Sequence, residues 1–342
     1  MPMESDLTIN SARFLAENVA ESTKQANAVL ADITANSPKW YQVGSARYRE
    51  MQESGKTPLP PPVLLPNAIE ATAPSRDSAR QIPVRVYQPD NEPSKGIFLH
   101  IHGGGHVLGS HDGQDSSLQT FANGTQLTSI SVGYRLAPEN PYPAAINDCI
   151  DAAEYLVDNP SKYGVLRFIG GESAGGNLSV LTAIHLLRSR PSHALSGLVL
   201  RYGQFDLGLG LPTIATPPSE KALMIDRHAM ERFNSAYAPG LSFEERRTPS
   251  LSPLYEDLPA LAAASPNGLP PALFICGTKD PLLDDTLLMS IKWSVAGAES
   301  ITKIYPGAAH GFTVIPGLPA AEEAKKISVQ FMREKLDVSS SV

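Results

Sequence analysis

The sequence predicts an α/β protein in which helices cover both faces of a mainly parallel sheet. Short apolar runs with strand character alternate along the chain with longer segments of helical periodicity. Such alternation is typical of parallel strands joined by crossover helices. The length of 342 residues, of which 42% are hydrophobic and 18% charged, suits a globular protein with a large core. We therefore expect the functional side chains at the carboxyl ends of the strands.

The N-terminal part of the chain predicts helices. Apolar residues recur at helical spacing from Phe14 to Ile33, and Pro38 ends the pattern, so we expect one amphipathic helix, intact or broken. A second helix is predicted over residues 45–53, with Gly55 as its stop. The proline-rich residues 58–66 predict an extended connector to the sheet.

The remaining chain predicts alternating strands and helices. Short apolar or alternating runs predict strands at residues 84–88, 96–102, 129–134, 166–170, 197–202, 272–276 and 300–304. Helical patterns lie around residues 144–157, 174–188, 284–295 and 320–336. Residues 205–270 break the alternation, with many prolines and glycines and one helix around 227–237. We interpret them as an insertion over the functional edge of the sheet.

Charge and cysteine content narrow the class of protein. The net charge of −7 argues against a nucleic-acid partner, which requires an excess of Lys and Arg. Cys149 and Cys276 are far apart in sequence and predict buried free thiols. The acidic start lacks the features of a secretory signal, and no run reaches the roughly 18 to 20 apolar residues of a membrane span. We expect a cytoplasmic protein that acts on a small molecule.

The segment Gly171-Glu172-Ser173-Ala174-Gly175 has the pattern of a nucleophile turn. It follows a predicted strand and precedes a predicted helix, which is where a serine nucleophile stands exposed on a sharp turn. Small flanking residues are required because the turn crowds any side chain. The alternative is a glycine-rich loop with a surface serine. It requires the other motifs to have arisen by chance.

The segment His102-Gly103-Gly104-Gly105 ends an earlier predicted strand. Backbone N–H groups can stabilise the oxyanion of a tetrahedral intermediate, and glycines let the main chain approach closely enough. We expect the donors to be Gly104 and Gly105, with Ala174 after the nucleophile. The alternative is a simple turn between strand and helix.

A base and an acid should follow the serine in the order serine, acid, histidine. His310 lies near the chain end, just after the last predicted strand, and predicts the base. Asp280 is the first acid after the penultimate strand and would orient the imidazole. Asp284 and Asp285 compete with it, but both lie where the next helix begins, and acids there are commonly caps or partners of the helix dipole.

A cluster of histidines raises the alternative of a metal site. His100, His102, His106 and His111 lie within twelve residues, and the first two share one face of a strand. No carboxylate or cysteine lies at a recognised ligand spacing from them, and the glycines already have a use. We expect no metal.

These motifs resemble the hormone-sensitive-lipase-like branch of α/β-hydrolase esterases, which is marked by an HGGG box. The resemblance extends from about Val84 to the chain end. It includes the segment Tyr134-Arg135-Leu136-Ala137-Pro138-Glu139, then Pro143-Ala144-Ala145 and Asp148, and the motifs Asp280-Pro281-Leu282 and His310-Gly311-Phe312. Two departures are Glu172, where Asp or Thr is more usual, and His106, where an aromatic or apolar residue is commoner.

The resemblance implies an α/β-hydrolase fold with an eight-stranded sheet and a helical cap. Residues 1–75 would contribute helices to the cap, and residues 76–342 would form the catalytic domain with the insertion at about 205–270. The implied activity is hydrolysis of short- to medium-chain carboxylic esters without a cofactor. The alternatives are a specialised acyl hydrolase, lactonase or acyltransferase, and a receptor on the same fold, against which His310 argues. The sequence does not determine the oligomeric state, and a homodimer is the candidate assembly.

The substrate pocket is expected to include residues that follow the glycine segment, end a strand or lie in the insertion. His106 follows the glycines and is expected to face the substrate. Phe205, Met224, Phe233 and Tyr237 are candidates for the pocket walls, although each is more often a simple core residue.

Overall fold

A single eight-stranded sheet forms the centre of the molecule. The structure is a computed structural model that describes residues 7–57, 61–90, 92–215 and 223–339. The strands lie in the order β1-β2-β4-β3-β5-β6-β7-β8 across the sheet. Their bounds are Ile69–Pro74 (β1), Gln81–Tyr87 (β2), Ile97–Ile101 (β3), Thr128–Val132 (β4), Leu166–Glu172 (β5), Gly197–Arg201 (β6), Ala272–Lys279 (β7) and Ser300–Ala309 (β8).

The sheet is mostly parallel, as the sequence predicts. β2 pairs in antiparallel fashion with both β1 and β4, and the remaining neighbours are parallel. Strand β1 is the one strand not predicted, and it falls within residues 1–75, which were assigned to the cap helices. Its alternating residues are mostly exposed, so the sequence carries little apolar signal there. The sheet therefore begins before the predicted boundary at residue 75.

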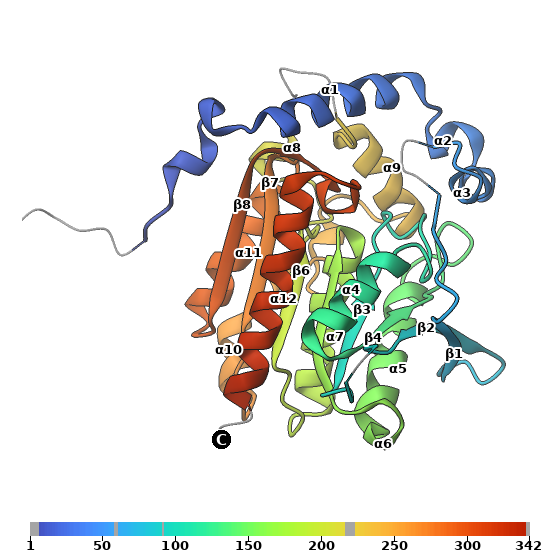
Figure 1. The fold of residues 1–342 in the computed structure, drawn as a ribbon, viewed down its shortest axis with the longest axis vertical. Coiled ribbons are helices and arrows are strands. Elements are labelled where there is room, and N and C mark those ends of the chain that lie inside the picture. Colours follow the sequence, from blue (N-terminus) through green and yellow to red (C-terminus); the bar gives the residue numbers. More distant parts are fainter. Residues whose placement is uncertain (1–6, 58–60, 91, 216–222, 340–342) are drawn as a thin grey trace, which may run out of the picture.

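Helices cover both faces of the sheet (Figure 1). The core on one face contains buried residues of α5, α7 and α11, and the core on the other contains those of α4 and α12. The bounds are Asp115–Thr125 (α4), Ala144–Asp158 (α5), Pro160–Tyr163 (α6), Ala174–Ser189 (α7), Leu283–Val295 (α11) and Pro319–Ser339 (α12). The predicted class of fold is thereby confirmed, although α4 was not predicted.

The N-terminal helices and the insertion helices at residues 212–215 and 227–237 lie together above the upper edge of the sheet, whereas the insertion helix at residues 258–264 lies lower, beside α11 (Figure 1). The predicted first helix is broken into two 3-10 turns followed by α1, whereas α3 has the predicted bounds. The elements are Ser11–Phe14 (η1), Ala16–Asn18 (η2), Glu21–Asn36 (α1), Trp40–Val43 (α2) and Ser45–Glu53 (α3). The hydroxyl of Thr34 donates to the carbonyl of Leu223 at 2.5 Å, which joins α1 to the insertion.

Within residues 205–270, the described part contains helical elements and no strand, as expected of an insertion. They are Pro212–Ala215 (α8), Arg227–Tyr237 (α9), Glu245–Arg247 (η3), Pro253–Tyr255 (η4) and Leu258–Ala264 (α10); a last 3-10 turn, Phe312–Val314 (η5), follows β8. Asp226 caps α9 by accepting from the N–H of Ala229 at 2.7 Å. Across the described residues, no helix is both long and apolar enough to cross a membrane.

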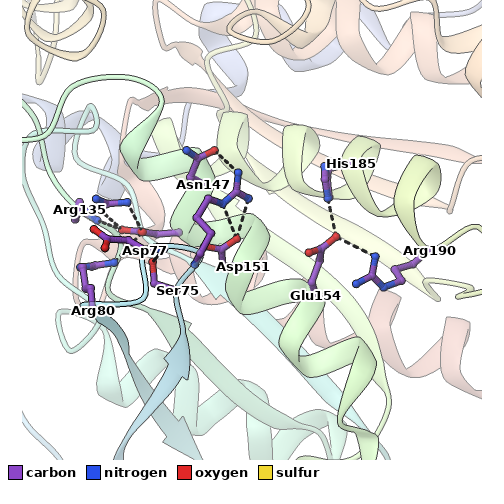
Figure 2. A network of polar contacts seen from close by, with 11 residues as sticks. Ser75, Asp77, Arg80, Arg135, Asn147, Asp151, Glu154, His185 and Arg190 are labelled. Atoms are coloured by element: carbon purple, nitrogen blue, oxygen red, sulfur yellow. Dashed lines mark hydrogen bonds and ion pairs between the residues drawn. The ribbon is translucent and has the colours of Figure 1, made fainter.

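Ion pairs fix α5 against its neighbours (Figure 2). The carboxylate of Asp148 is fully buried and accepts from Arg80 at 2.8 Å and Arg135 at 2.9 Å. Glu154 lies 2.9 Å from His185 of α7 and 3.1 Å from Arg190, just beyond that helix. A buried carboxylate requires such partners, so Asp148 ties the chain after β4, through Arg135, to the body of the domain.

Candidate active site

Ser173 lies on a sharp turn between β5 and α7. Its backbone has φ 55° and ψ −120°, a conformation that non-glycine residues rarely adopt and that marks strained functional positions. A Cβ on Gly171 would lie 2.2 Å from the carbonyl oxygen of Ile101, and one on Gly175 would lie 2.0 Å from it. Both glycines are therefore required for the turn to pass the end of β3, as the nucleophile motif predicts.

The structure brings Ser173, His310 and Asp280 together in one hydrogen-bonded chain. His310 follows the last residue of β8, and its Nε2 lies 2.9 Å from the Oγ of Ser173. Asp280 follows β7, and its carboxylate oxygens lie 3.0 and 2.9 Å from Nδ1 of His310. Asp280 also accepts from the N–H of Leu282 at 2.9 Å, which fixes its orientation.

The two competing acids have other partners. Asp284 accepts from the N–H of Thr213 at 2.7 Å. Asp285 accepts from the N–H groups of Phe205 and Asp206 at 2.6 and 2.7 Å. These acids therefore hold the start of the insertion rather than the histidine. Neither caps α11, but both lie in its first turn, where an acid interacts favourably with the helix dipole.

The glycines after β3 form a tight loop beside Ser173. Gly104 and Gly105 have φ values of 111° and 62°, and a Cβ on Gly104 would lie 2.1 Å from the carbonyl oxygen of Leu108. Within the described part of the chain, the backbone N–H groups of Gly104, Gly105 and Ala174 donate no hydrogen bond. Unpartnered N–H groups beside a nucleophile are suited to binding an oxyanion.

The segment after β4 supports this loop from behind. The hydroxyl of Tyr134 donates to the carbonyl oxygen of His102 at 2.8 Å. The backbone N–H of Ala137 donates to the carbonyl oxygen of His106 at 2.9 Å. Arg49 of α3 donates to the carbonyls of Val107 and Ala137 at 2.8 and 2.9 Å. The N-terminal helices, the loop and the segment thus form one connected structure.

A cavity of about 860 Å³ opens over Ser173 and His310. The insertion and the N-terminal helices supply apolar walls through Met224, Ile225, Met230, Phe233, Trp40 and Tyr41. Phe233 lies against Gly105, because a Cβ on that glycine would come within 2.3 Å of its ring. The ring of Trp40 packs on Phe233 at 5.1 Å between centroids. Predominantly apolar walls around a few polar groups are typical of a small-molecule site.

Two of the five predicted wall residues line this cavity, Met224 and Phe233. The other three, His106, Phe205 and Tyr237, lie in the core instead. His106 has a positive φ, which turns its ring inward to stack on Tyr237 at 3.8 Å, and burial lowers the pKa of its imidazole to about 3. Phe205 packs edge-on against Phe274 of β7. The expectation that His106 faces the substrate is therefore wrong.

Several residues that line the cavity were not predicted from the sequence, and Tyr202 and Trp40 are two of them. Tyr202 lies just after β6, and its ring packs against His310 at 4.9 Å while its hydroxyl bonds to that of Thr313 at 2.5 Å. Its position directly after a strand was an available signal. Trp40 reaches the cavity from the N-terminal helices, and no local pattern could have placed it there.

The clustered histidines lie in separate environments. His100 is in contact with Ser131 and Glu172 at 3.1 Å each, and His102 stacks on Tyr134. His111 lies 3.4 Å from Glu70.

Comparisons with known proteins agree with this architecture. Residues 98–314 match the family model described as alpha/beta hydrolase fold. The chain belongs to this family. It is 33% identical over 303 residues to the carboxylesterase NlhH of Mycobacterium tuberculosis, and this match covers 85% of the present chain and 88% of the relative. It is 27% identical to an ethyl acetate hydrolase of Pseudomonas putida, over 79% of this chain and 84% of that protein.

A solved structure has the same fold. The hyperthermophilic esterase of the archaeon Pyrobaculum calidifontis superposes with a TM-score of 0.78 and 28% identity, covering 92% of this chain and 98% of that one. The resemblance to esterases that the sequence motifs indicated is confirmed.

Proposed function

We propose that this carboxylic-ester hydrolase works through an acyl-enzyme on Ser173, with His310 as base and Asp280 as the partner of the histidine. The observation that carries the proposal is the hydrogen-bonded chain from Ser173 Oγ through His310 to Asp280, with no distance above 3.0 Å. A nucleophile, a base and an orienting acid within hydrogen-bond reach are the arrangement that acyl transfer requires.

In the first half of the reaction, His310 takes the proton of Ser173 as the serine oxygen attacks the ester carbonyl. The carbonyl oxygen becomes an oxyanion, for which Gly104, Gly105 and Ala174 offer their N–H groups. His310 then gives the proton to the departing alcohol, and an acyl-serine ester remains. In the second half, His310 takes a proton from water as the water oxygen attacks the acyl carbon. The bond to Oγ of Ser173 then breaks, His310 returns the proton to this oxygen, and the acid is released.

The cavity favours a small ester with an apolar portion. Met224, Phe233 and Trp40 can bury an acyl chain, and each buried methylene contributes about 0.8 kcal/mol. This supports the short- to medium-chain esters expected from the sequence. The helical cap, to which the N-terminal helices and the insertion at about 205–270 contribute, is proposed as the part that closes over this substrate. The cytoplasmic location and the homodimer stay predictions.

Labelling with diethyl p-nitrophenyl phosphate tests the assignment of the nucleophile. The reagent phosphorylates an activated serine, so peptide mass spectrometry should find the added diethyl phosphate on Ser173 and nitrophenol release should be stoichiometric. Asp280→Asn should slow the labelling, because the histidine loses its partner. An adduct on any other residue, or none, would contradict the proposal.

A further inference from the structure

Glu172 lies directly before Ser173 and points into the protein beneath the loop at Gly103. It is the last residue of β5 and is 4% exposed. A Cβ on Gly103 would lie 2.7 Å from the carbonyl oxygen of Glu172 and 3.2 Å from its Cγ. The glycine loop therefore rests directly on this residue.

The carboxylate of Glu172 uses both oxygens. Oε1 accepts from the N–H of Gly103 at 3.1 Å and from the side-chain amide of Gln114. Oε2 accepts from Nη2 of Arg201 at 2.9 Å and lies 3.1 Å from Nε2 of His100. One oxygen thus binds the loop, and the other binds the cation and imidazole below it.

Charge keeps this carboxylate ionised in the interior. Burial would raise the pKa of Glu172, but the contact with His100, the charge of Arg201 and the hydrogen bond from Gly103 outweigh it, and the pKa lies well below its ordinary value. Arg201 is 2% exposed, and Glu172 is its one ion-pair partner among the described residues. An ionised acceptor makes a stronger hydrogen bond to a backbone N–H than a neutral one does.

The bond to Gly103 matters because the next two residues in the chain are Gly104 and Gly105. Their N–H groups face the reacting carbonyl in the proposed mechanism. Both residues are glycines with positive φ, so they carry no side chain of their own that could anchor the loop. A shift of one ångström in an oxyanion donor is enough to lower the rate substantially.

We propose that Glu172 is a positioning residue for the reaction, whose carboxylate anchors Gly103 and so fixes the N–H groups of Gly104 and Gly105 toward the oxyanion. This inference rests on the proposed function. The rival account is that Glu172 only neutralises Arg201. The two differ in what a change of side-chain length does when the charge is kept.

Glu172→Asp keeps the charge but withdraws the carboxylate by one methylene. We expect kcat for p-nitrophenyl butyrate to fall roughly ten- to a hundredfold with little change in KM. Inhibition by a trifluoromethyl ketone, whose serine adduct carries an oxyanion, should weaken by a similar factor. Ser131→Ala, which removes the other partner of His100, is the control and should leave both values near those of the wild type.

A second variant separates the effect of side-chain length at position 172 from the effect of its charge. Glu172→Gln with Arg201→Gln removes both charges but keeps an acceptor of full length, so it should retain more of kcat than Glu172→Asp does. If Glu172→Asp is folded by circular dichroism and matches the wild type in kcat and in ketone inhibition, the inference is wrong. The inference is also wrong if the paired variant loses more activity than Glu172→Asp.

A separate measurement distinguishes failure of the proposed function from failure of the positioning role of Glu172. Labelling of wild-type Ser173 by diethyl p-nitrophenyl phosphate reports on the nucleophile alone. Labelling at Ser173 together with an unaffected Glu172→Asp overturns only the positioning role, whereas labelling elsewhere overturns both.

Discussion

Nε2 of His310 lies 2.9 Å from Oγ of Ser173, although the two residues are 137 positions apart in the chain. The proximity follows from the sheet: β5 and β8 are parallel members of it, and both residues follow the carboxyl ends of their strands. The carboxyl ends of parallel strands lie at the same edge of a sheet, so residues that follow different strands can meet there.

Asp280→Asn should lower kcat by roughly 10³- to 10⁴-fold, because the amide cannot stabilise the imidazolium and favours the wrong tautomer. Asp284→Asn is the matched control, since Asp284 bonds to Thr213 instead of the histidine. Its kcat should stay within a few-fold of the wild type. Steady-state kinetics with p-nitrophenyl butyrate checks both. Equal losses in the two variants would mean that Asp280 has no special role.

Gly105→Ala should lower kcat by about two orders of magnitude while the protein stays folded. The new methyl group would meet the ring of Phe233 at 2.3 to 2.8 Å, on a backbone with φ 62°. Adding Phe233→Leu should restore part of the loss, because it relieves the contact but not the backbone strain. A Gly105→Ala enzyme with normal kcat would contradict the assigned donor.

Arg49→Met should lower the free energy of unfolding by about 1 to 3 kcal/mol, measured by urea denaturation. The change removes hydrogen bonds to the carbonyls of Val107 and Ala137 and the ion pair with Glu139. Arg47→Met is the matched control, because its pair with Glu50 is exposed and should contribute at most about 1 kcal/mol. Equal effects would show that Arg49 does not join the N-terminal helices to the domain.

Cys149 and Cys276 should not react with Ellman's reagent in the folded protein. Both thiols are fully buried, and burial raises the pKa of each well above its ordinary value, so little thiolate forms near neutral pH. Unfolding in guanidinium chloride should release both. Rapid reaction of either thiol without denaturant would contradict the packing around it.

The sequence predicted those parts of the fold and site that local patterns encode. Gly171 and Gly175 were expected around Ser173 because a tight turn excludes side chains, and the clash of their Cβ atoms with Ile101 gives the physical reason. The pocket was predicted less well, because whether Phe205 or Tyr237 faces a cavity depends on how the insertion packs. Strand β1 was missed because it lies at the sheet edge, where most of its residues are exposed and its sequence carries little apolar signal.

The central claim is that Ser173 forms the acyl-enzyme, and pre-steady-state release of nitrophenol from p-nitrophenyl acetate tests it most directly. The wild type should release a burst that approaches one nitrophenol per chain before the slower steady rate, when deacylation limits turnover. Ser173→Ala, folded by circular dichroism, should show neither burst nor turnover above the rate of the buffer. A Ser173→Ala protein that retains the burst would contradict the account.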